Sequence, residues 1–385
     1  MRLVSMLATI FVLAAAGVQA KDAPKSIHVD CAKGESLNAA LADGAATLVV
    51  EFSGVCAEDV VIGRGNVTLR GIAAGAKIAG APSPAVAAPA IAIRGVTNVT
   101  LQDFAVQDAA RRGVDVRVAT AITLDGIVSD GNFSDGLLVS QGSSAFIRSS
   151  SFDDNGGDGI GVWQNSSATF EGTITLNGNN RVGLLLSGSS EGSVTFFGGQ
   201  VTANDNTVCG VSLQLGSATL FAAANPTTVS ASGNGNCGAS LFEESSWAGP
   251  LTVQNSPVGV DVTASTFESN ALSVSGCNIG LFAHLSAFVM LRAPSVSGNQ
   301  FGLRFDGATT QINNAVLTGN AVTDVRLQFG TRASFNASSS AGSVSCDGTV
   351  LVRGPVTCPA AALNQSPQTA LKQPGWRAEI LELRD

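Results

Sequence analysis

Four residues that could take part in acid–base chemistry recur at regular intervals near residue 300. Asp261, His284 and Asp306 are spaced 23 and 22 residues apart, and Arg304 lies two residues before Asp306. A carboxylate next to an imidazole can orient the ring as a general base, and a guanidinium can neutralise a uronate. We therefore take these four residues as candidate catalytic residues. The competing interpretation is a surface histidine next to an ordinary cross-strand ion pair.

Aromatic residues and one arginine could bind a substrate. Trp163, Phe242, Phe282 and Trp247 would offer flat apolar surfaces to sugar rings if they are exposed, in a chain with only 5% aromatic residues. Arg117 would meet an anionic group on the same ligand. The alternative is that some of these rings pack beneath loops.

Acidic residues also recur in pairs one repeat apart. Asp130 and Asp153 form one pair, and Asp135 and Asp158 form the other, each 23 residues apart. Clustered carboxylates can hold Ca²⁺. Aspartates in turns more often accept hydrogen bonds from nearby backbone N–H groups. The second interpretation is favoured, so we expect no cofactor and no metal ligand among the site residues.

A long internal repeat would position all of these residues. A short apolar phrase returns every 21–28 residues, about 23 on average, and fixed self-similarity of this kind indicates stacked coils. The residues that precede each phrase are Ala90, Gly113, Gly136, Gly159, Gly183, Gly210, Gly238, Gly259, Gly280, Gly302 and Asp324.

Each phrase has the pattern of a half-buried strand. The first and third residues after every anchor are apolar, whereas the second and fourth are mixed. This period of two places the first and third residues in the core and the second and fourth on an outward face. Equivalent residues of successive coils then lie about 4.8 Å apart. The candidate catalytic and aromatic residues, Trp247 excepted, are second or fourth residues, and His284 and Asp306 would be direct neighbours.

Asparagines recur in the turns before the anchors, where stacked amides can bond along the coils. They are Asn155, Asn179, Asn206, Asn234, Asn255, Asn299 and Asn320.

The coil length, the short strands and the asparagine positions resemble those of right-handed parallel β-helix proteins of the pectin-lyase-like superfamily. The resemblance covers about residues 47–340. It implies an all-β fold of about 11–12 coils and a polysaccharide ligand, anionic or neutral, along an outward strand face. If the protein is an enzyme, the resemblance implies a polysaccharide lyase, an epimerase or a glycoside hydrolase.

The motifs of particular enzymes in that superfamily are mostly missing. The polygalacturonase set N-T-D, G-H-G and R-I-K is matched only by the paired Asp153-Asp154, and the D-P-H-D of alginate epimerases is absent. The arginine motif of pectate lyases is absent too. The resemblance therefore implies a fold more strongly than an activity.

The two ends of the chain differ from the repeat. Residues 1–20, MRLVSMLATIFVLAAAGVQA, have the basic start, apolar stretch and small-residue cleavage site of a secretory signal peptide. Residues 21–46 are expected to form an N-terminal cap with a short amphipathic helix over 35–43. The solenoid would then cover residues 47–340. Residues 341–385, with Trp376, are expected to form a C-terminal cap, because solenoid ends must be covered.

The composition restricts the class of protein. The formal net charge is −8, only 13% of the residues are charged, and no lysine lies between Lys77 and Lys372. A chain with so few basic residues is a poor candidate for binding the phosphate backbone of a nucleic acid. No second apolar run of membrane length follows the signal peptide. We therefore expect a secreted or periplasmic protein without a membrane span after cleavage.

Seven cysteines in an exported chain predict disulfides with one thiol left over. Cys209 and Cys237 each stand one place before an anchor in adjacent coils, within disulfide reach. The other expected pairs, Cys31 with Cys56 and Cys346 with Cys358, are close in sequence. Cys277 is expected to be the free, buried thiol.

Three functions remain open at this stage. The first is an exported protein that binds, and in some cases processes, a polysaccharide along its outward strand face. The second is a non-catalytic structural or adhesive β-helix of the periplasm or cell surface. The third is an assembly protein that uses the rod as a scaffold. A dense polar cluster on one face would favour the first, and this chain carries a thin one.

Overall fold

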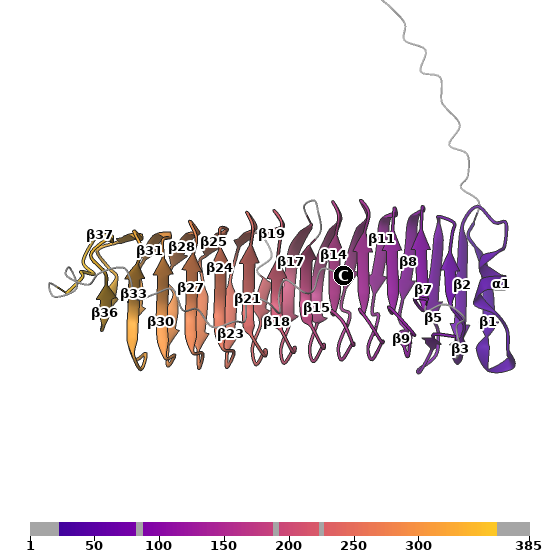
Figure 1. Cartoon of the computed structure of the whole chain (residues 1–385). Helices are drawn as coiled ribbons and strands as arrows, with labels where there is room; N and C mark the ends of the chain where they lie inside the picture. Colours follow the sequence, from indigo (N-terminus) through magenta and orange to yellow (C-terminus); the bar gives the residue numbers. More distant parts are fainter. Residues whose placement is uncertain (1–22, 82–87, 188–191, 223–226, 360–385) are drawn as a thin grey trace, which may run out of the picture.

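The fold was analysed in a computed structural model, which describes residues 23–81, 88–187, 192–222 and 227–359. The described chain winds into an elongated solenoid, with its coils stacked side by side along one axis (Figure 1). Every paired strand is parallel to its neighbour in the adjacent coil. The predicted signal peptide, Trp376 and the last residues of the predicted C-terminal cap lie outside the described residues.

One face of the solenoid is a 13-stranded sheet, here called sheet B, which contains the repeated apolar phrases. Its strands are β4 (Val60–Ile62), β7 (Ile91–Arg94), β10 (Val114–Arg117), β12 (Leu137–Ser140), β14 (Ile160–Trp163), β16 (Val182–Ser187), β18 (Cys209–Leu213), β21 (Cys237–Phe242), β24 (Val258–Thr263), β27 (Ile279–His284), β30 (Phe301–Asp306), β33 (Thr323–Gln328) and β36 (Val344–Cys346). The strands β4 and β36 lie beyond the first and last anchors, so the solenoid has more coils than the 11–12 expected.

The second face is formed by one column of a 21-stranded sheet, here called sheet A. The strands of this column are β1 (Lys25–Asp30), β2 (Leu48–Ser53), β5 (Val67–Gly71), β8 (Thr97–Gln102), β11 (Thr120–Asp125), β13 (Ser144–Arg148), β15 (Ser167–Thr175), β17 (Ser193–Thr202), β19 (Ala218–Phe221), β22 (Ser246–Ala248), β25 (Thr266–Ser269), β28 (Phe288–Arg292), β31 (Thr309–Asn313), β34 (Arg332–Phe335) and β37 (Leu351–Arg353).

The third face contains the shorter strands. In the C-terminal half they belong to sheet A, because the long β17 pairs with both β19 and β20. These strands are β20 (Thr227–Ser230), β23 (Leu251–Gln254), β26 (Leu272–Ser275), β29 (Ser295–Ser297), β32 (Val316–Leu317) and β35 (Ser340–Ala341). In the N-terminal half they form a separate three-stranded sheet of β3 (Val55–Ala57), β6 (Lys77–Ala79) and β9 (Ala105–Gln107).

The register confirms the predicted stacking of equivalent residues. Leu137 pairs with Ile160, Ile160 pairs with Leu184, and all three side chains are fully buried. These inward residues belong to one continuous apolar core that runs through the described coils. No single coil could bury its own apolar face, so each coil is stabilised by its neighbours.

The asparagine ladder is present, with one more residue at its start and an interruption between Asn234 and Asn299. The Nδ2 atoms of Asn155, Asn179 and Asn206 each donate to the next asparagine at 3.1–3.2 Å, and Asn132 extends the ladder by one coil. Asn255 is not a member. The backbone N–H of Asn234 donates to Ser256 instead, and Cys277 and Asn299 continue the column.

The predicted disulfides are confirmed. Cys31 bonds to Cys56, Cys209 to Cys237 and Cys346 to Cys358, with Cα separations of 5.0, 4.6 and 5.6 Å. Cys277 is a free, buried thiol. Its place in the asparagine column explains its burial, because that column faces the interior of each turn.

The N-terminal helix is shorter than expected. It is the single turn α1 (Leu37–Leu41), capped by Ser36, and it buries Leu37, Ala40 and Leu41 against the first coils. Parallel pairing already begins at β1, within the predicted cap segment 21–46, and continues to β37, past residue 340. The capping roles of the two end segments stay predictions.

Candidate functional site

The outward side of sheet B carries two parallel columns of side chains. The first outer column consists of the second residues after each anchor, namely Ala92, Asp115, Leu138, Gly161, Leu185, Ser212, Ser240, Asp261, Phe282, Arg304 and Arg326. The second outer column consists of the fourth residues, namely Arg94, Arg117, Ser140, Trp163, Ser187, Gln214, Phe242, Thr263, His284, Asp306 and Gln328. From β7 to β27 the first outer column is buried, whereas most of the second outer column is half-buried or exposed.

Sheet B brings the four predicted catalytic residues together on three adjacent strands, but not in the predicted pairing. His284 Nε2 lies 3.2 Å from Asp261 Oδ1 and 2.8 Å from Thr263 Oγ1. Asp306 is in register with His284. Its carboxylate instead accepts two hydrogen bonds from Arg304, at 2.7 and 3.1 Å. The prediction that Asp306 orients His284 is therefore wrong, because Arg304 occupies that carboxylate from the same strand.

Phe282 lies at the centre of this cluster. The imidazole of His284 stacks on its ring with a centroid distance of 4.4 Å, and the guanidinium of Arg304 lies 4.6 Å from the ring centroid. The ring is only 3% exposed. Phe282 is therefore not free to stack on a sugar, and it holds His284 and Arg304 in fixed positions on the sheet.

The cluster contains several ionisable side chains that are largely buried from water. His284 and Asp261 are buried, and Asp306 Oδ1 is a buried acceptor without a hydrogen-bond partner among the described residues. On the next strand, burial lowers the pKa of Arg326, and the nearby charge of Arg304 lowers that pKa further. An imidazole held by a carboxylate has the arrangement of a general base. Its burial restricts the approach of a large substrate.

Trp163 is a half-buried side chain at the centre of sheet B. Its indole lies across Gly161, where an added Cβ would come within 3.1 Å of the indole Nε1. The glycine therefore lets the ring lie on the sheet surface, and the side chain is half-buried. Nε1 is a buried donor without a partner among the described residues. The part of the ring that reaches the surface is suited to stacking on a flat ligand.

The other predicted aromatic residues have different environments. Phe242 is half-buried in the second outer column, three strands away from Trp163. Trp247 is fully buried, and its ring packs against Phe221 and Phe196 inside the core. The suggestion that Trp247 contacts a ligand is therefore wrong, since it occupies an inward position of β22.

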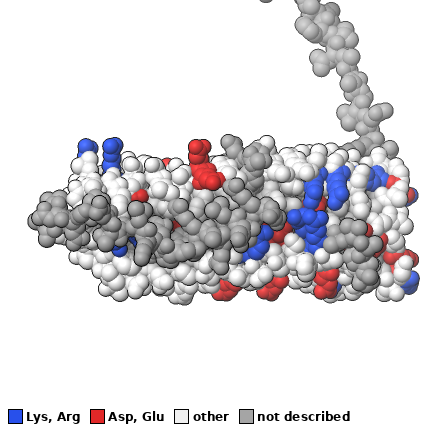
Figure 2. All heavy atoms as spheres, in the orientation of Figure 1, with Lys and Arg blue, Asp and Glu red and all other residues white. Residues whose placement is uncertain are grey.

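Arginines near the N-terminal half of sheet B are neutralised by neighbouring carboxylates. Arg117 lies 2.9 Å from Asp115, which Arg94 approaches at 3.8 Å, and Arg112 lies 2.8 Å from Asp135. Figure 2 shows blue and red side chains mixed toward the N-terminal end of the solenoid. Arg117 thus carries no uncompensated charge for an anionic ligand.

The acidic pairs occupy the predicted columns and bind backbone groups. Asp130 accepts from the N–H of Asp153, and Asp158 accepts from the N–H of Val182. Burial raises the pKa of Asp130, and it raises the pKa of Asp158 to about 7 against the attraction of Arg181. Within the described ranges there is no group of three or more acidic, histidine or cysteine side chains arranged to hold a metal. These hydrogen bonds support the turn interpretation of the acidic residues.

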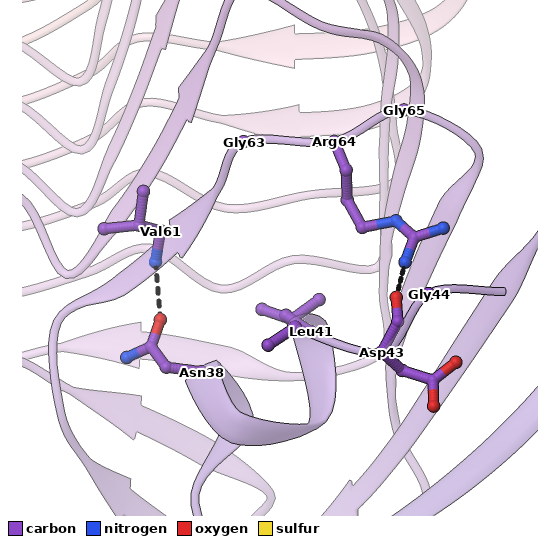
Figure 3. A pocket seen from close by; sticks show the side chains of 9 residues that line it. Asn38, Leu41, Asp43, Gly44, Val61, Gly63, Arg64 and Gly65 are labelled. Atoms are coloured by element: carbon purple, nitrogen blue, oxygen red, sulfur yellow. Dashed lines mark hydrogen bonds between the residues drawn. The ribbon is translucent and has the colours of Figure 1, made fainter. Parts of the chain in front are cut away.

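An open pocket of about 660 Å³ lies at the N-terminal end, between α1 and the chain after β4 (Figure 3). Its charged groups are already engaged. The guanidinium of Arg64 donates to the backbone carbonyls of Asp43 and Ala45, and Lys25 binds the Asp43 carboxylate. This pocket is therefore a structural junction of the first coils rather than a second candidate site.

Two groups of the site did not emerge from sequence reasoning. Thr263 belongs to the second outer column, but it was not singled out as a partner of His284. Gly161 was recorded as a small residue in the first outer column, without its consequence for Trp163. The sequence did contain a signal for the position of Trp163. A glycine stands two residues before this tryptophan, and strand residues at that spacing lie on the same face.

The described part of the chain contains no helix long and apolar enough to cross a membrane. Comparison with curated protein sequences gave no match. A solved structure described as "Crystal structure of Agl-KA catalytic domain" is similar at 15% sequence identity with a TM-score of 0.33. The match covers 82% of this chain and 64% of that one, so this chain spans less than two thirds of its length, and we infer no activity from it.

A protein-family model matches the central part of the chain. Residues 89–258 match the model described as "Right handed beta helix region". Those residues form part of the uninterrupted parallel ladder of sheet B, and coils of the same register continue on both sides of the matched range. The described part of the chain therefore has the fold of a right-handed parallel β-helix.

Proposed function

We propose that this protein is an exported β-helix that binds a polysaccharide along the second outer column of sheet B. The observation that carries the proposal is the half-buried Trp163, whose ring lies on the sheet surface across Gly161. Phe242 provides another half-buried ring about 14 Å along the same column, three strand spacings away. Ser187 and Gln214, joined by a 3.1 Å hydrogen bond, supply polar groups between the two rings.

The charge pattern favours a neutral polysaccharide over an anionic one. Arg94 and Arg117 in this column and Arg304 beside it each lie within 4 Å of a carboxylate. A uronate would have to compete with those carboxylates, whereas the hydroxyl groups of a neutral sugar can bond to both partners of such a pair. Export is part of the proposal, and three disulfides support an oxidising compartment.

Binding without turnover is the form of the proposal that the geometry favours. The Asp261–His284 pair is buried and stacked on Phe282, and a general base must come within hydrogen-bond reach of its substrate. The pair is better placed to hold the C-terminal half of the face in shape than to abstract a proton from a polymer.

The proposal is tested with a glycan array on the full chain, followed by titration calorimetry with neutral and uronate polymers. We expect Trp163→Ala to weaken binding at least tenfold, a loss of about 1.4 kcal/mol or more, as expected for removal of a stacking ring. The matched control is Phe146→Ala, a half-buried ring on the outer face of sheet A. Equal losses in both variants, or no binding on the array, would contradict the proposal and favour the scaffold alternative.

Catalysis is checked in the same samples. Reducing ends and unsaturated uronates are measured after incubation with each bound polymer. Product that disappears in His284→Ala would show that the buried pair is catalytic, and the binding-only form of the proposal would then be wrong.

A further inference from the structure

A groove lies along the edge of the solenoid where sheet A meets the third face, which is the edge that sheet B does not share. Its volume is about 360 Å³, and residues of four successive coils line it, from β19 and β20 to β28. Three strand spacings separate the first of these coils from the last, so the groove extends for about 14 Å along the stacking axis. Its volume lies within the range of about 300–1,000 Å³ that small-molecule sites occupy.

The ring of Phe221 forms an aromatic wall of the groove. A Cβ at position 249 would come within 2.3 Å of two atoms of this ring, so Gly249 leaves the space that the ring occupies. The ring stacks on Phe196 with a centroid distance of 4.5 Å and meets Trp247 edge-on at 5.3 Å. Both of these rings are fully buried, and they fix Phe221 at the boundary between the core and the groove. Met290 adds a further apolar side chain to the lining.

Two charged side chains of the groove have no partner. Glu268 and Arg292 lie on the adjacent strands β25 and β28, and no described residue forms a hydrogen bond or an ion pair with either side chain. Elsewhere on the same sheet, Arg148 stands in register with Glu171 and binds it at 2.9 Å. Glu268 instead stands in register with Met290. The groove therefore offers a free carboxylate and a free guanidinium beside an aromatic wall.

We propose that this groove binds a short segment of a neutral polysaccharide, as a second subsite separate from Trp163. The inference rests on the proposed function for the class of the ligand and adds a site on another side of the molecule. A sugar hydroxyl can accept from the Arg292 guanidinium and donate to the Glu268 carboxylate, so the hydroxyl groups of one segment satisfy both. The C–H face of a sugar ring can pack on Phe221. A uronate would bring its own carboxylate close to Glu268.

The length of the groove supports a linear ligand. An extent of three strand spacings fits several linked sugar rings better than one compact molecule. Trp163 belongs to sheet B, whereas the groove lies on the edge that sheet B does not share. Two subsites placed in this way would let one solenoid hold two polysaccharide strands, which gives a binding-only protein a role in connecting polymers.

The test is titration calorimetry of the full chain with neutral tetrasaccharides of β-1,3-linked glucose, β-1,4-linked glucose and β-1,4-linked mannose. We expect at least one of them to bind at two sites per chain. Arg292→Ala should weaken one site about tenfold or more, as for removal of a hydrogen bond to a charged group. Trp163→Ala should weaken the other site. The matched control is Arg332→Ala, because Arg332 is an exposed arginine of sheet A that lies outside the groove and forms no ion pair with a described residue.

A second variant fills the groove without removing a polar group. Ala248 is exposed and lines the groove, so the larger side chain in Ala248→Trp stays outside the core. This variant should lose the same site as Arg292→Ala. Circular dichroism and the unfolding midpoint check that both variants keep the fold, so that a lost site is not a lost structure.

The outcomes separate this inference from the proposed function. A single site that Trp163→Ala removes and Arg292→Ala leaves unchanged would overturn the inference, and the proposed function would stand. A single site with the opposite response would support the groove and contradict the role of Trp163. Binding to none of the tetrasaccharides would overturn the inference, while the glycan array with long polymers decides the proposed function separately. An equal loss in Arg332→Ala would also overturn it.

Discussion

Sheet A and sheet B share one ladder geometry but have different outer faces. Both sheets bury their inward residues completely and stack them in register. The outward residues of sheet A are polar, charged or apolar, and most of them are half-buried or exposed, as at Thr195, Gln311 and Leu220. The outward residues of sheet B include buried leucines and a hydrogen-bonded histidine. The ladder therefore restricts only the inward side chains of each strand to apolar types. The outward side chains are free to differ, and they give each face its own chemistry.

The strongest test of this comparison is a charge introduced on each outer face. We expect Leu185→Asp to lower the free energy of unfolding by about 4 kcal/mol, because a carboxylate would be buried without a partner. Thr195→Asp, in the same coil on sheet A, should cost about 0.5 kcal/mol because its side chain reaches water. Denaturant unfolding of both variants measures the difference. Equal costs would show that the first outer column is open to water and would break the comparison.

A second test concerns the buried charges in the turns that lead into sheet B. Burial raises the pKa of Asp158 to about 7 from the usual 3.8. The folded chain therefore retains a proton that the unfolded chain releases, and stability is lost as the pH rises from about 4 to about 7.

The variant Asp158→Asn cannot lose that proton. It should gain stability relative to the wild type as the pH rises, on the order of 2–3 kcal/mol between pH 4.5 and pH 8. Thermal or denaturant unfolding at both pH values measures this gain. A difference that does not change with pH would show that Arg112 and Arg181 keep Asp158 ionised throughout.

The smallest expected effect compares the asparagines of two kinds of turn. Asn179 belongs to the buried ladder before sheet B, whereas Asn336 bonds to Asn314 at 3.1 Å in an exposed turn of sheet A. We expect Asn179→Ala to cost about 1.5 kcal/mol, because it leaves buried groups on Asn155 and Asn206 unsatisfied. Asn336→Ala should cost less than about 0.5 kcal/mol. Unfolding midpoints of the two variants would sharpen the comparison, and similar values would remove burial as its cause.

Much of the site follows from the repeat. The spacing of 23 and 22 residues brings Asp261, His284 and Asp306 onto adjacent strands, as expected from the sequence. The spacing does not determine which carboxylate binds His284, because the strands on both sides of β27 carry an aspartate. Arg304 forms an ion pair with Asp306, and the imidazole therefore bonds to Asp261 and Thr263.

The sequence by itself determined the stacked coils, the inward columns and the three disulfides. The coils, the columns and the Cys209–Cys237 bond follow from a period that repeats over ten intervals, because stacking turns that period into vertical contacts. The other two disulfides follow from the closeness of their cysteines in the sequence. Only the tertiary structure decided that Trp247 lies in the core, that Trp163 lies on the surface across a glycine, and that the outward leucines of sheet B are buried. Those outcomes depend on side-chain directions and on segments distant in the sequence, which a local period does not encode.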